Sequence, residues 1–186
     1  MGRSEDTRRR LQEVAVALFA RHGFDNVTVE EVARTVGVSH MTFFRHFATK
    51  EAVVLDDPYD PVIAAAVAET DPSLPALERV RRAVLESWEG LDEPDDDLTR
   101  ARIELAAEHP KLRARVWENN RRTEEIIVSA LSRGGVPSLE ANVAAGAVLG
   151  ALTAALFDWA DTPADDTLGD RVRRAMVLLA PLRVMS

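Results

Sequence analysis

The sequence contains no cysteine. That absence excludes disulfide bonds, thiolate metal sites and a cysteine nucleophile, and it fits a reducing cytoplasm, where we expect the protein to work. The first six residues, Met-Gly-Arg-Ser-Glu-Asp, hold no apolar segment and do not predict a signal peptide. The longest apolar run, residues 143–157, is 15 residues long, which is short of the roughly 20 needed to cross a bilayer. Its alanines and glycines predict a buried helix instead.

Signals of catalysis are also scarce. Three of the four histidines, His22, His40 and His46, lie in the first third of the chain, and His109 has no serine–aspartate partner motif. The sequence has no glycine-rich phosphate loop and no metal-ligand spacing. We therefore predict no catalytic residues, no metal site and no cofactor. A small all-α enzyme stays open only as an unlikely alternative.

The net charge of −8 is unevenly distributed. Residues 1–50 carry 8 basic and 6 acidic side chains, a balance of +2, whereas residues 51–186 carry 15 and 25, a balance of −10. Arg8, Arg9 and Arg10 lead into the basic part, and the sequence leaves open whether they contact phosphate or form a solvated helix face. Local charge decides contact with a polyanion, so the N-terminal part remains able to bind nucleic acid.

Residues 28–47 predict two short helices joined by a tight turn. Thr28 is suited to cap the first helix, with Glu31 at the position of a capping-box partner. Gly37 predicts the end of that helix, and Ser39 the cap of the next. This pattern is typical of a helix-turn-helix, although helical proteins that never bind DNA contain similar pairs.

In the second of these helices, Phe43 and Phe47 are expected to face inward, which leaves the other faces to seven residues: Ser39, His40, Met41, Thr42, Phe44, Arg45 and His46. A recognition helix reads bases with its first exposed residues. His40, Met41 and Thr42 are therefore predicted to contact base edges. Met41 and Thr42 suit a thymine methyl group, and His40 a guanine or a phosphate.

The stretch Gly37-Val38-Ser39-x-x-Thr42-Phe43-Phe44-Arg45-His46-Phe47-x-x-Lys50-Glu51 resembles the TetR family of bacterial transcriptional regulators. The preceding pattern of Phe19, Gly23-Phe24, Thr28 and Val32-Ala33 agrees with it. The resemblance is dense over residues 8–55 and thin afterwards. It implies backbone contacts from five residues: Thr28, Ser39, Phe44, His46 and Lys50. Phe44 departs from the family, which usually has tyrosine there, and this puts one phosphate contact in doubt.

The predicted fold is all-α, with about nine helices in two domains. Residues 1–48 would form a three-helix DNA-binding domain after a basic arm at 1–5, and residues 49–186 a helical effector-binding and dimerisation domain. Helices are expected at about 6–22, from 49, and at 75–91, 97–108, 110–133, 138–159 and 168–182. Pro58 and Pro61 predict a break near 56–60 with a restart at Asp60. Ser138 is predicted to cap the nearly apolar helix that it precedes.

Aromatic and polar residues of the C-terminal helices form a candidate ligand pocket: Trp88, Glu104, Trp117, Asn120, Arg121 and Phe157. Each of them singly also suits a core or surface position. The family resemblance implies a small effector that releases DNA. Residues 100–110 and the arginine-rich helix after them resemble a branch that binds acyl-coenzyme-A-like ligands.

The resemblance also implies a homodimer that is formed through the last two helices and binds a palindromic operator in double-stranded DNA. The function expected is that of a repressor relieved by its effector. A DNA-binding protein without an effector is the alternative. The sequence does not specify the operator, the effector or the target genes.

Overall fold

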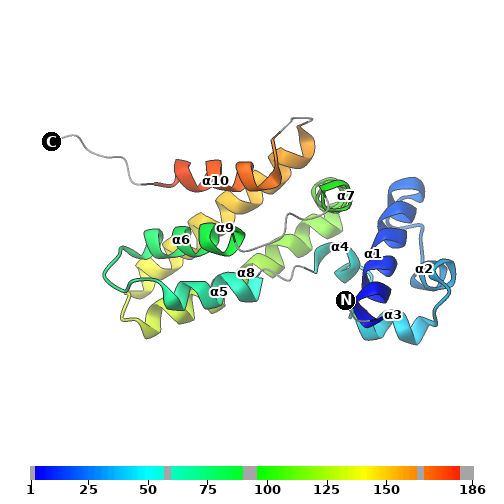
Figure 1. Cartoon of the computed structure of the whole chain (residues 1–186), viewed down its shortest axis with the longest axis horizontal. Helices are drawn as coiled ribbons and strands as arrows, with labels where there is room; N and C mark the ends of the chain where they lie inside the picture. The colour runs from blue at the N-terminus through cyan, green and yellow to red at the C-terminus, as the bar shows by residue number, and fades with distance from the viewer. Residues whose placement is uncertain (1–2, 57–59, 90–95, 163–165, 181–186) are drawn as a thin grey trace. The chain divides into compact units, whose positions relative to one another are not determined.

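The computed structural model describes residues 3–56, 60–89, 96–162 and 166–180 of the chain. Within these ranges it contains ten α-helices and no strand (Figure 1). Their bounds are α1 Arg3–His22, α2 Val29–Val36, α3 His40–His46, α4 Ala52–Leu55, α5 Asp60–Glu69, α6 Ala76–Glu89, α7 Asp96–Glu108, α8 Pro110–Arg133, α9 Ser138–Asp161 and α10 Leu168–Leu178. The all-α prediction is confirmed.

The chain divides into two compact units. The first comprises Met1–Asp56 and Asp97–Val116, and the second comprises Asp57–Asp96 and Trp117–Ser186. Helix α8 therefore begins in the first unit and ends in the second.

The core of the first unit is built from aromatic and branched side chains of α1 to α4. Leu11, Phe19, Phe43 and Phe47 are all at most 1% exposed. The rings of Phe19 and Phe24 meet edge to face, with centroids 4.9 Å apart, and Phe24 is buried. Gly23, with φ of 85°, ends α1 in the left-handed region that favours glycine.

The second unit is centred on α6, α9 and α10, which pack against one another, while α5 packs on α6 (Figure 1). Helix α9 is long and apolar enough to cross a membrane by length and composition. Its packing explains that composition in another way: Ala141, Ala145, Val148 and Trp159 are buried in this unit. Helix α9 is therefore a core helix, as the sequence predicts.

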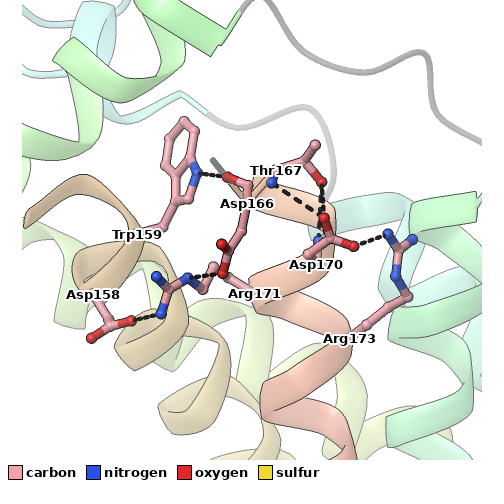
Figure 2. Close-up of polar contacts among 7 residues, drawn as sticks. All are labelled: Asp158, Trp159, Asp166, Thr167, Asp170, Arg171 and Arg173. Carbon is pink, nitrogen blue, oxygen red and sulfur yellow. Dashed lines mark hydrogen bonds and ion pairs between the residues drawn. The ribbon is translucent and has the colours of Figure 1, made fainter. Parts of the chain in front are cut away.

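The connection between α9 and α10 is held by polar contacts (Figure 2). Arg171 of α10 pairs with Asp158 of α9 and with Asp166, at 2.5 and 3.1 Å. The indole N–H of Trp159 donates to the Asp166 carbonyl at 3.1 Å. Thr167 and Asp170 form a capping box at the start of α10. These contacts fix where α10 begins.

Several predicted boundaries were wrong. Residues 3–5 belong to α1 rather than to an arm, and residues 1–2 lie outside the described ranges. The helix expected from Thr49 begins at Ala52, although the Thr49 hydroxyl accepts from the Ala52 N–H at 3.1 Å. Ser138 is the first residue of α9 and not its cap, because Pro137 precedes it in an extended conformation.

Helix α10 ends at Leu178 and not at 182, where the last residues lie outside the described ranges. The end of α4 at Leu55 and the start of α5 at Asp60 agree with the predicted break, of which residues 57–59 lie outside the described ranges. The segment that restarts at Asp60 is a separate helix, so the described residues form ten helices where about nine were expected. Trp117 and Ile126 of α8 are large apolar side chains that are 56% and 51% exposed.

Candidate DNA-binding site

The turn between α2 and α3 is defined by three local signals. The Thr28 side chain accepts a hydrogen bond from the Glu31 N–H at 3.1 Å and caps α2. Gly37 has φ of 82°, and its N–H donates to the carbonyls of Ala33 and Arg34. The Ser39 side chain accepts from the Thr42 N–H at 3.1 Å and caps α3. All three caps confirm the sequence prediction.

Buried aromatics decide which face of α3 is presented to solvent. Phe43 and Phe47 are 0% and 1% exposed. Met41 and Phe44 are 74% and 39% exposed, the largest apolar side chains that the first unit leaves accessible among its described residues. Exposed large apolar groups on a short helix mark a contact surface rather than a core.

The polar groups of α3 are partly engaged already. His40 Nε2 lies 3.2 Å from Glu30 Oε1 of α2, and the His40 ring meets the Phe44 ring edge to face at 4.7 Å. The hydroxyls of Ser39 and Thr42 are 2.9 Å apart and share a hydrogen bond. Because the cap oxygen of Thr28 acts as an acceptor, its own O–H remains a donor for an incoming oxygen.

The C-terminal end of α3 is supported from α1. One Arg8 guanidinium N–H donates to the His46 carbonyl, a second donates to Asp56 at 3.0 Å, and the group stacks 4.2 Å from the centre of the Phe47 ring. Burial, followed by the positive charges of Arg45 and Arg8, lowers the pKa of His46. Arg8 thus has a structural role that neither sequence-based alternative included, whereas Arg9 pairs with Glu13 along α1.

Lys50 lies against the aromatic core of the first unit. Its ammonium donates to the Phe24 carbonyl and lies 4.3 Å from the centre of the Phe24 ring and 5.4 Å from that of Phe19. Desolvation by burial lowers the pKa of Lys50. The fold therefore holds the ammonium at the tip of the side chain.

Of the predicted ligand residues, the structure brings few together. Glu104 belongs to the first unit and the other five to the second. Asn120 of α8 donates to the Thr153 hydroxyl of α9 at 2.7 Å. Arg121 is exposed and pairs with Glu125 at 3.4 Å. Trp88 lies against Gly169, where a Cβ would come within 3.0 Å of its indole nitrogen, and Phe157 is half-buried.

Sequence reasoning missed two parts of this unit. Glu30 was not assigned a role, because no spacing rule pairs a residue of α2 with the first residue of α3. Arg102 of α7 was not assigned one either, yet it donates to the carbonyls of Val54 and Asp56 at 2.9 and 2.7 Å. Both contacts depend on tertiary packing, which a periodic pattern does not report.

The capped α2–α3 pair, its glycine turn and the exposed N-terminal face of α3 together define a helix-turn-helix DNA-binding protein. Comparison with known proteins agrees. The sequence profile described as "Bacterial regulatory proteins, tetR family" matches residues 11–56. The profile described as "MftR C-terminal domain" matches residues 74–183. The chain belongs to the TetR family and is a DNA-binding transcriptional regulator, not an enzyme.

Individual relatives fit this assignment. MftR of Mycobacterium tuberculosis, described as a candidate regulator of mycofactocin biosynthesis, is 28% identical over 84% of this chain and 81% of its own length. The SmeT–triclosan complex has 18% identity and a TM-score of 0.60, over 94% of this chain and 90% of its own. Thermus thermophilus FadR, a repressor in complex with lauroyl-CoA, has 23% identity and a TM-score of 0.50, over 92% of each chain. The two structures support the fold alone.

Proposed function

We propose that this chain is a homodimeric repressor that acts in the cytoplasm and leaves its operator when a small molecule binds its C-terminal domain. The observation that carries the proposal is the exposed face of α3, where Met41 projects beside His40 and Phe44 while Phe43 and Phe47 are buried. A short helix anchored by two aromatic rings can enter the major groove as a rigid unit.

Roles for the DNA contacts follow from position and chemistry. His40, Met41 and Thr42, at the N-terminal end of α3, read base edges. Backbone phosphates are contacted by the two helix caps, by the C-terminal half of α3 and by one residue after it: Thr28, Ser39, Phe44, Arg45, His46 and Lys50. Phe44 has no hydroxyl and offers only ring contact, so it packs against the sugar–phosphate surface. The functional boundary between the DNA-binding and effector domains falls near residue 48.

A dimer through the last two helices is supported by their exposed apolar side chains. Leu139 and Val143 of α9 are 76% and 60% exposed, and Val177 and Leu178 of α10 are 65% and 80% exposed. These helices pack on each other within one chain, so a second copy can cover both at once. Two-fold symmetry then requires a palindromic operator with half-sites about 34 Å apart.

Effector control is supported by the way that α8 is shared between the units. Its first residues group with the DNA-binding unit, and the remainder groups with the second unit. A ligand that displaces α8 in the second unit would therefore act on the DNA-binding unit through a continuous helix. It can shift the equilibrium only by its differential affinity for the two states.

The effector that we propose is apolar with a polar end, and an acyl thioester is the first candidate. Trp88, Trp117 and Phe157 of the second unit offer apolar surface, whereas Asn120 and Arg121 of the same unit offer polar groups. FadR of Thermus thermophilus, which shares the fold, is a repressor in complex with lauroyl-CoA, so this compound is a reasonable probe.

Selection of binding sites from random duplex DNA tests the proposal. We expect an enriched palindrome, and we expect lauroyl-CoA or a related thioester to release it. No enrichment, even after the protein has been unfolded and refolded free of ligand, would contradict DNA recognition. An enriched palindrome that no effector releases, with no thioester detected by native mass spectrometry, would favour an effector-independent DNA-binding protein.

A further inference from the structure

Glu30 and His40 form a contact between the two helices of the DNA-binding motif. Glu30 lies in the first turn of α2, and His40 is the first residue of α3. The His40 Nε2 atom lies 3.2 Å from Glu30 Oε1. On its other side the imidazole meets the Phe44 ring at 4.7 Å, with the planes inclined by 67°. The ring is therefore held between a carboxylate of one helix and an aromatic ring of the other.

The ion pair with His40 adds little to the fold, although the dipole of α2 favours a carboxylate in its first turn. The side chains of His40 and Glu30 are 52% and 68% exposed, and ion pairs this accessible contribute little to stability. DNA is a dense polyanion, so a carboxylate on the surface that faces it lowers affinity for every sequence. Glu30 is thus unfavourable for binding to DNA in general, and its contact with the first residue of α3 points to a role in recognition.

We propose that Glu30 is a positioning residue that determines sequence specificity through His40. While Nε2 of His40 stays beside the Glu30 carboxylate, it is turned away from a phosphate. His40 then presents one fixed edge to the base pair beneath the start of α3. The carboxylate lowers affinity for all DNA and increases discrimination between sequences, as expected of an element that acts against wrong partners. This inference rests on the proposed function, because it requires α3 to read DNA.

Three substitutions separate orientation from charge. Glu30→Ala removes both the charge and the acceptor. Glu30→Gln removes the charge but keeps a carbonyl oxygen that accepts from Nε2–H. Glu31→Gln removes a charge from the same turn of α2 without touching His40, and glutamine also suits that capping-box position. Thermal unfolding of each variant checks that the fold is intact.

Each protein is used to select sites from random duplex DNA, and its affinity for the selected site and for unrelated duplex is then measured. We expect all three variants to bind unrelated DNA about two- to threefold more tightly at low salt. Only Glu30→Ala should lose preference at one base pair of each half-site, by about fivefold or more. Glu30→Gln should retain that preference because its acceptor is retained.

A fourth variant tests whether His40 carries the effect. In a His40→Ala background, adding Glu30→Ala should leave the base preference unchanged, since the residue that Glu30 positions is absent. Continued dependence on Glu30 in that background would overturn the proposal, because Glu30 would then read the base itself. Unaltered preference in Glu30→Ala, or equal loss in Glu31→Gln, would also overturn it. A wild-type protein that selects no site contradicts the proposed function itself, whereas a wild-type palindrome with unaltered variants contradicts only this inference.

Discussion

At the scale of single residues, Lys50 shows how a side chain can serve both the fold and a ligand. Its ammonium donates to the Phe24 carbonyl and lies over the Phe19 and Phe24 rings. An ammonium has three N–H donors, so the contact with Phe24 leaves donors for a phosphate. The resemblance to the TetR family implies such a contact.

We therefore expect Lys50→Ala to weaken binding to all duplex sequences alike. The slope of log affinity against log salt should become shallower by about 0.9, the value for one phosphate. Lys111→Ala is the matched control, since Lys111 is the other lysine of the chain and pairs with Asp25 at 3.1 Å. Fluorescence anisotropy at several salt concentrations measures both slopes. A change in the preferred base would contradict a backbone role for Lys50.

Glu78 is the residue whose ionisation most clearly supports stability. Its carboxylate accepts from Arg81 at 2.8 and 2.9 Å and from Arg82 at 2.7 Å. Hydrogen bonds from Arg81, and then from Arg82, lower the pKa of Glu78 to about 2, against a desolvation effect that raises it. Since the folded pKa is depressed below the ordinary 4.5, this stabilisation is present above pH 4.5 and is lost as the pH falls toward 2.

Glu78→Gln should thus lower the free energy of unfolding at pH 7 by about 1–2 kcal/mol. The difference from wild type should shrink as the pH falls below 4.5, because the wild-type carboxylate is then increasingly protonated. Urea unfolding at a series of pH values measures this. The control is Glu125→Gln, which removes an exposed partner of Arg121 and should change little. A difference that stays constant with pH would contradict the linkage.

Residues with purely tertiary roles are the ones that the sequence could not reveal. Arg79 is 3% exposed and donates to the Thr70 hydroxyl at 3.0 Å and to the Val67 carbonyl at 3.4 Å. Helical periodicity assigns arginine to a solvated face. The Arg79 guanidinium is buried nevertheless, and its positive charge is favourable near the C-terminal end of α5. Gly134 leaves it room, since a Cβ there would come within 3.1 Å of the guanidinium.

At the scale of the element, α4 illustrates how a short helix is held by its neighbours. It has only four residues, too few to be stable alone. Arg102 of α7 donates to the Val54 and Asp56 carbonyls. Gln12 of α1 donates to the Val53 carbonyl at 2.9 Å, and Arg8 pairs with the Asp56 carboxylate. Side chains of α1 and α7 thus bind the carbonyl groups at the end of α4 and the Asp56 carboxylate that follows it.

Arg102→Lys should loosen the end of α4 while preserving the charge. A single ammonium lacks the planar fork that reaches two carbonyls at once, so one carbonyl loses its partner, at a cost of about 1 kcal/mol. Hydrogen exchange should become faster for the amides of residues 53–56 and remain unchanged in α9. Arg113→Lys, on an exposed part of α8, is the control. Unaltered protection of α4 would show that Arg102 does not hold it.

The elements that were predicted correctly carry their own boundary signals. Thr28, Gly37 and Ser39 defined α2 and α3, and His109-Pro110 together with Gly134 bounded α8. The errors occur where one sequence signal is compatible with two structures. A serine after a proline can be either a cap or the first helical residue, and Ser138 is the latter.

At the scale of the whole molecule, the exposed apolar side chains of α9 and α10 bear on assembly. Val177 is 65% exposed and lies beside Leu178 at 80%. An arginine at either position costs little in an isolated chain, because the site is already solvated. In a dimer through these helices, the same arginine would be buried opposite its symmetry copy without a counter-ion, which is strongly unfavourable.

Val177→Arg should accordingly leave each chain folded but shift the protein toward monomers. A monomer places one α3 on DNA at a time, so affinity for a full palindrome should fall by about 100-fold or more, while affinity for a single half-site should change little. Val62→Arg is the matched control, since Val62 of α5 is 43% exposed and lies outside α9 and α10. Sedimentation velocity measures the oligomeric state, and titrations with half-site and palindromic DNA measure affinity. A Val177→Arg protein that remains dimeric contradicts this interface. A monomer that binds the palindrome as tightly as wild type contradicts the need for two DNA-binding domains.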